Sequence, residues 1–242
     1  GSGNQVRPAQ PATAPAGNQN RPAQSGSGNQ VRPAQPATAP AGNATTASTA
    51  DPLAAADYLT ELEKEVVREL NRARTNPRGY AGYIREEKAL LRGTLLERPG
   101  EIALRTNEGA RAYDEAIAAL ERMSPISALA PSKGMSQAAK DHVADQGPRG
   151  GMGHNSSNGN TPFQRMNRYG SWESTAGENI SYGHDIARRI VIALIVDDGV
   201  PSRGHRKNIF NPAFKVVGVA CGPHRTYRHM CVQDFAGGYT EK

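Results

Sequence analysis

The stretch 176–214 begins Ala-Gly-Glu-Asn-Ile and, after an apolar segment, continues from Asp197 as Asp-Asp-Gly-Val-Pro-Ser-Arg-Gly-His-Arg-Lys-Asn-Ile. It places one acidic residue, Glu178, within an apolar segment and two adjacent carboxylates one short loop before His205. A second histidine, His154, lies upstream in Gly-Met-Gly-His-Asn-Ser-Ser. Two imidazoles and two carboxylates suit a divalent metal ion or acid/base chemistry. Because the spacing is long, only the fold can bring these side chains together.

The composition predicts one globular domain and a tail that cannot bury itself. The chain has 242 residues, a mean hydropathy of −0.63 and 37% hydrophobic residues. Its formal net charge is +6, and residues 1–50 hold three arginines and no Asp, Glu or Lys, which leaves +3 for the rest. That mild excess, without an Arg/Lys stripe among aromatic residues, indicates a solvated surface and no nucleic-acid partner.

Residues 1–18 recur letter for letter as residues 26–43. The repeat is rich in Pro, Ala and Gln and has no aromatic residue, so burial cannot offset the entropy cost of ordering it. We therefore expect residues 1–50 to form a disordered linker ahead of one folded domain, residues 51–242. The linker is either a spacer that holds the domain away from an envelope or anchor, or a neutral repeat expansion.

The sequence also bears on location. No run of about 18 apolar residues occurs, so no transmembrane segment is expected. The chain starts at glycine without a visible signal peptide, and we expect its numbering to begin after a removed leader. Its two cysteines are too few for a cysteine-rich zinc module or a disulfide-dense scaffold.

Apolar spacing predicts several helices. Residues that recur at intervals of three and four indicate an amphipathic helix from residues 51–52 to about residue 76, and a second helix follows it. Asn107 is expected to cap a third helix and Ser132 a fourth. Residues 185–196 are apolar on nearly all sides, which predicts a fully buried helix.

The C-terminal part predicts an antiparallel hairpin. Residues 216–221 and 227–235 alternate between the two faces of a strand. If the turn centres on Thr226, Cys221 and Cys231 lie directly opposite each other, close enough to form a disulfide. Such a bond goes with an extracytoplasmic location. Short strands among helices predict an α+β fold.

Several motifs follow one another in order along the chain. They are Gly-His at residue 154, Gly-Glu-Asn-Ile, an acidic turn, Gly-His-Arg-x-Asn-Ile, and Asn-Pro-x-Phe-x-x-Val-Gly-Val. This order resembles the CAP superfamily, which includes cysteine-rich secretory proteins, antigen 5, plant pathogenesis-related proteins and bacterial SCP-like extracellular proteins. The resemblance covers residues 57–239, and several ordered motifs are more specific than any single one. It implies the CAP α-β-α sandwich, a small antiparallel sheet with helices on both sides.

In the CAP family two histidines and two acids line a cleft. The resemblance places four residues of this chain in those positions: His154, Glu178, Asp198 and His205. The family's second acid is usually Glu in a Trp-x-x-Glu phrase, whereas here Ile195 stands at the Trp position and Asp198 at the Glu position. Aspartate is one methylene shorter, so its reach to a shared ion is reduced, and Asp197 is the alternative.

We expect these four residues to bind a divalent metal, with zinc first, because two neutral imidazoles and two carboxylates balance its charge and Zn²⁺ accepts both ligand types. Three neighbours are expected to orient the ligands: Asn179, Arg206 and Asn208. The alternative interpretation is structural. Glu178 could bond to backbone amides, and Arg203 or Arg206 could pair with the acids in place of an ion.

The function implied is binding rather than catalysis. His-Glu-x-x-His, Gly-x-Ser-x-Gly and a Gly-rich phosphate loop with Lys are absent from the sequence. Many CAP proteins have no established catalytic activity, and the family is associated with lipid or sterol binding, host interaction and occasional proteolysis. We therefore expect a secreted or cell-envelope (periplasmic) protein with an envelope or host partner.

Two other functions stay open. The first is a hydrolase in the same cleft, either metal-activated or a Ser/His peptidase, with His154, Glu178 and His205 as catalytic candidates. Three serines lie near the histidines in sequence: Ser156, Ser157 and Ser202. The second is a carrier of a lipid, sterol or small hydrophobic ligand whose groove lies away from the four cleft residues.

Overall fold

The computed structural model describes residues 17–20 and 53–242, and its central element is a five-stranded sheet. The strands are β1 (Gly17–Asn20), β5 (Ala130–Pro131), β6 (Gly170–Tyr182), β7 (Val216–His224) and β8 (Arg228–Glu241). Their order in the sheet is β1-β6-β8-β7-β5. All neighbours are antiparallel except β5, which lies parallel to β7.

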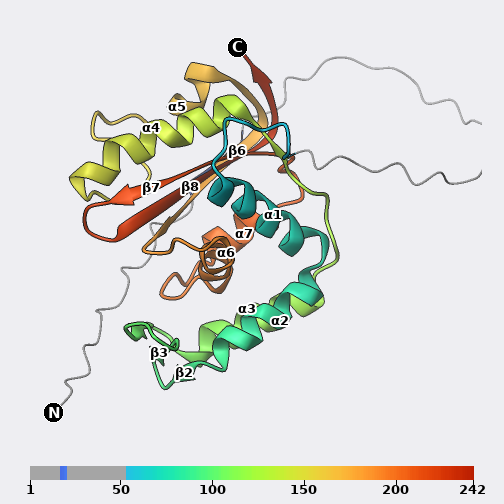
Figure 1. Cartoon of the computed structure of the whole chain (residues 1–242). Coiled ribbons are helices and arrows are strands. Elements are labelled where there is room, and N and C mark those ends of the chain that lie inside the picture. The colour runs from blue at the N-terminus through green and yellow to red at the C-terminus, as the bar shows by residue number, and fades with distance from the viewer. Residues whose placement is uncertain (1–16, 21–52) are drawn as a thin grey trace, which may run out of the picture.

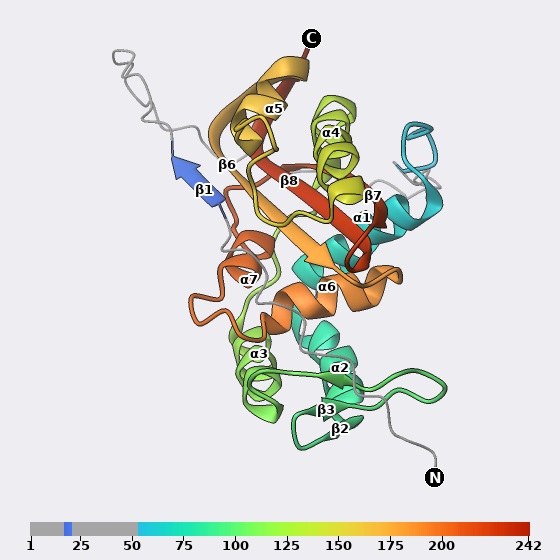
Figure 2. The same cartoon turned by 90° about the vertical axis from the view of Figure 1, so that its left-hand side faces the viewer.

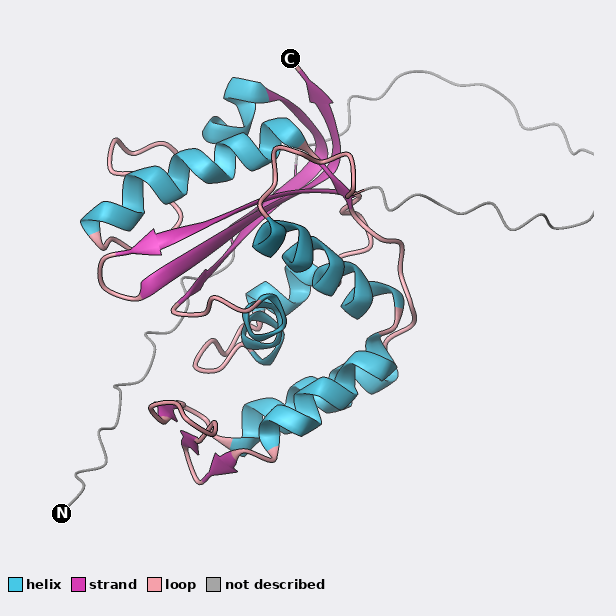
Figure 3. Cartoon of the chain, in the orientation of Figure 1, coloured by secondary structure: helices cyan, strands magenta, loops and turns pink. Residues whose placement is uncertain are grey.

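Helices cover both faces of this sheet (Figures 1 and 2). α4 (Lys133–Arg149) and α5 (Pro162–Tyr169) pack on one face, and α1 (Glu61–Thr75), α6 (Ala187–Val196) and α7 (Gly204–Ile209) pack on the other. Figure 3 shows the same layers by secondary structure. The predicted α+β class and α-β-α sandwich are confirmed. Within the described residues, no helix has the length and apolarity that a membrane span needs.

A further helix pair packs outside α1 and α6 (Figure 1). It consists of α2 (Pro77–Lys88) and α3 (Ala110–Arg122). The segment between the two helices carries a small sheet of two-residue strands, β2 (Leu91–Arg92), β3 (Leu95–Leu96) and β4 (Leu104–Arg105). This pair matters for the site because α3 contacts α6 directly.

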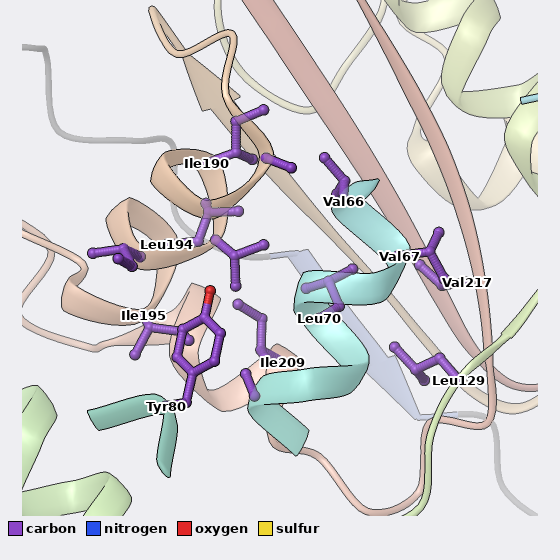
Figure 4. Packing of buried hydrophobic residues seen from close by; sticks show 14 of the residues in the cluster. Val66, Val67, Leu70, Tyr80, Leu129, Ile190, Leu194, Ile195, Ile209 and Val217 are labelled. Carbon is purple, nitrogen blue, oxygen red and sulfur yellow. The ribbon is translucent and has the colours of Figure 1, made fainter. Parts of the chain in front are cut away.

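The largest core lies between the sheet and the helices α1 and α6. Figure 4 shows Val66 and Leu70 of α1, Ile190 and Leu194 of α6, and Val217 of β7 gathered there. None of the five is exposed to solvent. A fully buried aliphatic side chain contributes about 1.5–3 kcal/mol, so this layer fixes α6 and with it the turn that follows.

α1 begins at Glu61 because its start is fixed by a capping box. The Thr60 hydroxyl accepts from the Glu63 amide at 3.4 Å, and the Glu63 carboxylate accepts from the Thr60 amide at 2.7 Å. Two backbone donors that the helix leaves unpaired are thereby satisfied. Residues 51–52, where the sequence predicted the start, lie outside the described residues.

Four residues of the predicted linker form a strand. β1 pairs with the outer edge of β6, with Gly17 opposite Glu178 and Asn20 opposite Thr175. The sequence predicted no strand here, because nothing in this polar segment alternates. The edge of β6 supplies the reason, since its backbone groups can pair with any extended segment. The remainder of residues 1–50 lies outside the described residues, so the disordered linker stays a prediction.

The C-terminal hairpin forms as predicted. β7 and β8 pair antiparallel with Cys221 opposite Cys231, and a disulfide joins the two cysteines. The turn lies between His224 and Arg228, around Thr226. Counting outward from the turn was enough to find this pair, because directly opposite residues in a hairpin share one register position.

Candidate functional site

Glu178 lies on β6 with its side chain fully buried. Its carboxylate lies 2.7 Å from Nδ1 of His154 and pairs through its other oxygen with the guanidinium of Arg165. The His154 side chain is 14% exposed and is the most exposed of the three. The structure thus brings together the first two of the four predicted residues, and adds an arginine that the sequence analysis did not single out.

Arg165 ties β6 to the loop that carries His154. It comes from α5 and is buried. Its Nη1 donates to the carbonyl oxygens of His154 and Asn160, at 2.8 and 3.2 Å. The same nitrogen reaches the Ser156 hydroxyl at 3.2 Å, while Nη2 meets Glu178. A guanidinium can bridge in this way because its donors form a rigid fork.

His142 of α4 supports the same loop from the other side. Its Nε2 lies 2.9 Å from the carbonyl oxygen of Gly153, and its Nδ1 lies 3.3 Å from the Ser156 hydroxyl. The Tyr182 hydroxyl accepts from the Gly153 amide at 3.1 Å. Burial lowers the pKa of His142, so this imidazole is neutral and acts as a loop support.

Asp234 is a fully buried acid that the sequence analysis missed. It stands directly opposite Glu178 in the pairing of β6 with β8. The signal was present, because Asp234 alternates with Val232 and Ala236, which pack in apolar clusters. A carboxylate at such a position rarely lacks a partner. We name five residues the Glu178 cluster: His142, His154, Arg165, Glu178 and Asp234.

The surroundings of Glu178 and Asp234 shift the pKa values of these two acids in opposite directions. Burial works to raise the pKa of Glu178, but the hydrogen bond from His154 and the charge of Arg165 hold it below its usual value. Burial, together with the negative charge of Glu178, raises the pKa of Asp234 well above its usual value. Acids whose environments drive their pKa values apart are concentrated at functional sites.

The other predicted histidine, His205, forms a second pair with Asp197. Its Nδ1 lies 2.6 Å from Oδ1 of Asp197, and its backbone amide donates to Oδ2 at 2.9 Å. Both side chains are fully buried. Asp197 caps the end of α6 in the left-handed conformation, with φ of 58°, which aspartate tolerates better than most residues.

The structure corrects the assignment of Asp198. Its carboxylate accepts from the backbone amides of Asn107 at 2.6 Å and Glu108 at 2.7 Å, so it fixes the chain just before α3. The prediction that Asn107 caps α3 is also wrong, since the N-cap is Gly109. The left-handed turn at Asp197 is the reason that Asp198 faces α3, because it sends the side chains of Asp197 and Asp198 in different directions.

Asn179 and Asn208 connect the two histidine–carboxylate pairs. Nδ2 of Asn208 donates to Oδ1 of Asn179 at 3.0 Å, and Nδ2 of Asn179 donates to the carbonyl oxygen of His205 at 3.1 Å. Because Asn179 follows Glu178, these bonds hold β6 against α7. Arg206, the third residue expected to orient ligands, instead donates to carbonyl oxygens in the last turn of α6.

The alternative that Arg203 or Arg206 pairs with the two acids is not what the structure shows. Arg203 pairs with Glu108 and Glu115, and Arg206 pairs with Glu115. Hydrogen bonding from Arg203, against the opposing effect of burial, lowers the pKa of Glu108 to about 2. Arg203 also donates to the carbonyl oxygen of Asp197 at 2.7 Å, so it stabilises the turn rather than a carboxylate of the site.

The predicted metal set does not form as a group of four. Within residues 17–20 and 53–242, no three or more His, Cys, Asp or Glu side chains are placed to hold a metal ion. Both carboxylate oxygens of Glu178 are engaged, by His154 and Arg165, and Asp198 faces α3. The four residues therefore do not fit an ion in the predicted form, and we derive no step through one.

The serine-hydrolase alternative gains no support from the contacts of its serines. The Ser156 hydroxyl contacts His142 and Arg165. The Ser157 amide donates to Asp145, on the outer side of α4. Neither contact forms the row of nucleophile, imidazole and acid that such chemistry uses.

A groove of about 720 Å³ opens between α1, α2 and α6. None of the Glu178 cluster lines it. Leu62, Leu90 and Ile192 contribute apolar surface, and Arg188 lies over the ring of Tyr83 at 3.8 Å. Cavities of this size and character hold small organic ligands.

A family model described as the cysteine-rich secretory protein family, CAP, matches residues 28–235. The match begins inside the predicted linker. A Bacillus subtilis (strain 168) protein, described as uncharacterized protein YkwD, is 35% identical over 85 residues. That alignment covers 35% of this chain and only 31% of the length of the relative.

Two solved structures are also similar. An extracellular protein containing an SCP domain from Bacillus anthracis is 25% identical, over 46% of this chain and 34% of that chain, with a TM-score of 0.38. An outer surface protein from Borrelia burgdorferi is 20% identical, over 48% of this chain and 80% of that chain, with a TM-score of 0.40. The ordered motifs, the sandwich and a family match over most of the residues agree: the chain belongs to CAP, the cysteine-rich secretory protein family.

Proposed function

We propose that this chain is a secreted or cell-envelope-associated CAP protein that acts by binding an envelope or host partner, and that His154, held by the rest of the Glu178 cluster, is its contact residue. One observation carries the proposal: a fully buried carboxylate and a buried guanidinium hold one partly exposed imidazole, that of His154. Removing an ion from water costs several kcal/mol even after relaxation. A fold that accepts this cost beneath a ring that is 14% exposed favours a functional role for the ring.

The site presents the edge of a held imidazole ring, 14% exposed, to a partner. Because Nδ1 of His154 faces Glu178, the ring is held in one orientation. Arg165 fixes the loop on which the ring stands. The Cys221–Cys231 disulfide supports a location outside the cytoplasm, where such bonds persist.

Cosedimentation with purified cell-envelope fractions of the producing organism tests this proposal. The wild-type chain is compared with His154→Gln, and His229→Gln is the control because His229 is 40% exposed on the hairpin. We expect at least about a tenfold loss of affinity in the first variant, or about 1.4 kcal/mol, and no loss in the control. Equal binding by all three proteins would count against the proposal.

Uptake of a divalent ion, with zinc first, stays a prediction from the sequence. The positions of Glu178 and Asp198 make the original set of four unsuitable. Zinc titration of the wild-type chain beside His154→Ala tests it independently of envelope binding. Stoichiometric uptake that disappears in the variant would restore a metal role for this part of the molecule.

The groove between α1, α2 and α6 favours a second candidate, a carrier of an amphipathic ligand such as a lipid. Its apolar surface is bordered by charged residues, as a ligand with a polar head and an apolar body requires. Binding of a fluorescent fatty acid should weaken in Ile186→Glu, since Ile186 lines this groove and is 46% exposed. Ile102→Glu is the matched control, at 57% exposure outside this groove. Extraction of the purified chain without detectable lipid would argue against a carrier.

A further inference from the structure

We propose that residues 175–178 of β6 form a strand-addition site on the outer edge of the sheet, and that three copies of one short motif in residues 1–50 are alternative occupants of it. The motif is Gly-Asn-Gln-x-Arg-Pro-Ala-Gln, where x is Val or Asn, and its copies begin at Gly3, Gly17 and Gly28. The first four residues of the middle copy lie on the edge as β1. The proposal goes beyond the proposed function, because strand addition does not depend on His154.

The outer edge of β6 is suited to strand addition. β6 has 13 residues and pairs along its inner side with β8. Within residues 17–20 and 53–242, β1 is the strand that pairs with its outer side (Figure 2). An edge strand offers a row of backbone N–H and C=O groups to an extended segment. Proteins capture peptides through added strands of this kind, with main-chain hydrogen bonds as the source of affinity.

The structure limits this site to four residues. On one side lies the bulge of β6 around Ser174, whose φ is 59°, and a bulge interrupts the hydrogen-bond ladder. On the other side Asn208 of α7 donates to the carbonyl oxygen of Glu178 at 3.4 Å and to the side chain of Asn179 at 3.0 Å. The strand is thus free of such interruptions over residues 175–178, which are the residues that β1 pairs with.

The three copies offer the same backbone to this site. Gly17 of β1 stands opposite Glu178, and Asn20 stands opposite Thr175. The copies at residues 3–6 and 28–31 repeat Gly-Asn-Gln and differ only in the fourth residue, which is Val in both. Valine favours strands more than asparagine does. Since the pairing is made by backbone groups, whatever seats the middle copy also suits the other two.

Proline restricts the remainder of this segment. A proline has no N–H to donate to a ladder and is largely excluded from strands. In residues 1–50, the stretches of at least four residues without proline are 1–7, 16–21, 23–32 and 41–50. The first three each contain one copy of Gly-Asn-Gln-x, and the fourth lacks the Gln. The segments that can pair as strands are therefore mostly the copies themselves.

Each copy is also within reach of the edge. Residue 31, the end of the nearest four-residue copy, precedes Leu53 by 22 positions. A chain spans at most about 3.3 Å per residue, or roughly 70 Å here. A domain of the size of residues 53–242 has a radius of gyration of about 16 Å and is roughly 40 Å across. Because site and occupants belong to one chain, the pairing is intramolecular and independent of protein concentration.

Residue-resolved amide hydrogen exchange of the full chain tests the proposal. Asn18→Pro/Gln19→Pro blocks the middle copy, since the amides of adjacent residues point to opposite sides of a strand and one of the two must face β6. A six-proline variant makes the same change in every copy, at residues 4, 5, 18, 19, 29 and 30. The matched control carries six prolines in stretches that proline already interrupts, at residues 9, 12, 13, 34, 37 and 38.

We expect the variant with only the middle copy blocked to keep the protection of residues 175–178 within about twofold of wild type, because two copies remain. The control should behave in the same way. The six-proline variant should exchange these amides at least about tenfold faster, because no copy is left to cover them. The amide of Val232, on the inner strand β8, should be unchanged throughout and reports that the sheet is intact.

Three results would overturn the proposal. Loss of protection when only the middle copy is blocked would confine the site to residues 17–20 and refute the exchange of copies. Wild-type protection in the six-proline variant would show that these copies do not cover the edge. Protection that falls when the wild-type protein is diluted about tenfold would mean that the added strand comes from a second copy of this chain, against the intramolecular assignment.

Discussion

Nδ1 of His205 lies 2.6 Å from Oδ1 of Asp197, which occupies the left-handed cap of α6, while the next residue, Asp198, faces α3. Asp197→Asn should retain the backbone conformation, because Asn also accepts positive φ. It should cost about 1.5–3 kcal/mol, the range for a buried hydrogen bond to a charged group, measured by urea unfolding.

Asp198→Asn is the matched control for that measurement. It changes the same chemical group one residue later, and Asp198 is less buried than Asp197. We expect the His205 ring signals in an NMR spectrum to move in Asp197→Asn and to stay in place in Asp198→Asn. Movement in the second variant alone would mean that Asp198 is the partner of His205.

Replacement of Arg165 should be among the most destabilising single changes in the chain. Arg165→Met leaves the Glu178 anion buried without its cation, which costs about 3–5 kcal/mol. Arg165→Lys keeps the charge but loses the fork that reaches the His154 loop, so its cost should be smaller. Arg168→Met is the control, because Arg168 is about half exposed beside Asp141 and should cost less than about 1 kcal/mol. Similar unfolding midpoints for the variants at 165 and 168 would refute this ranking.

The disulfide should stabilise the hairpin by closing a loop of ten residues. The chain-entropy relation gives about 2–3 kcal/mol for a loop of that length. Cys221→Ser/Cys231→Ser should therefore unfold at lower urea concentration than the oxidised wild type. Native wild-type protein should take up no thiol reagent until it is reduced, and labelling before reduction would contradict the bond.

Stability in acid should depend on Glu108. Hydrogen bonding from Arg203 lowers its folded-state pKa to about 2, below the unfolded value of about 4.3. Its contribution is therefore fully present above about pH 4.3 and is lost as the pH falls toward about 2. Glu108→Gln lacks that contribution, so its unfolding free energy should change less than that of wild type across this window. Parallel curves for the two proteins would show that Glu108 does not carry the dependence.

Asp234 should give a pH dependence of the opposite sign. Its folded-state pKa is raised by burial and by Glu178, so the folded chain keeps a proton that the unfolded chain releases above about pH 3.9. Wild type then loses stability as the pH rises toward the folded pKa, whereas Asp234→Asn does not. The difference in unfolding free energy should shift in favour of the variant from about pH 4 upward. A variant that becomes relatively weaker with rising pH would contradict this sign.

The sequence was sufficient where a pattern is local. Alternation and the position of Thr226 predicted the partners Cys221 and Cys231, because register in a hairpin follows from the turn alone. Helical spacing predicted α1 and its neighbour α2 in the same way. These elements depend on the spacing of apolar side chains along the chain, which the sequence shows without knowledge of the helix or strand that packs against them.

The site depended on features that no local pattern contains. The left-handed cap at Asp197 decides which of Asp197 and Asp198 pairs with His205. Matching the chain to the family's Trp-x-x-Glu phrase selected Asp198, whereas the structure places Asp197 there. Arg165 appeared as an ordinary polar residue of a short helix, because its partners lie on another strand and loop. Asp234 could have been found, since a carboxylate on the inward face of a strand conflicts with its neighbours.

The turn after α6 has a consequence for how distant parts of the molecule communicate. The Asp197 carboxylate pairs with the His205 ring, and the Asp198 carboxylate accepts from the Glu108 amide just before α3. The peptide unit between the two aspartates therefore connects the α2–α3 pair to the His205 ring. A ligand that displaced α3 would act on His205 through the two adjacent residues Asp197 and Asp198. A change in the position of the α2–α3 pair would in this way reach the buried His205–Asp197 pair.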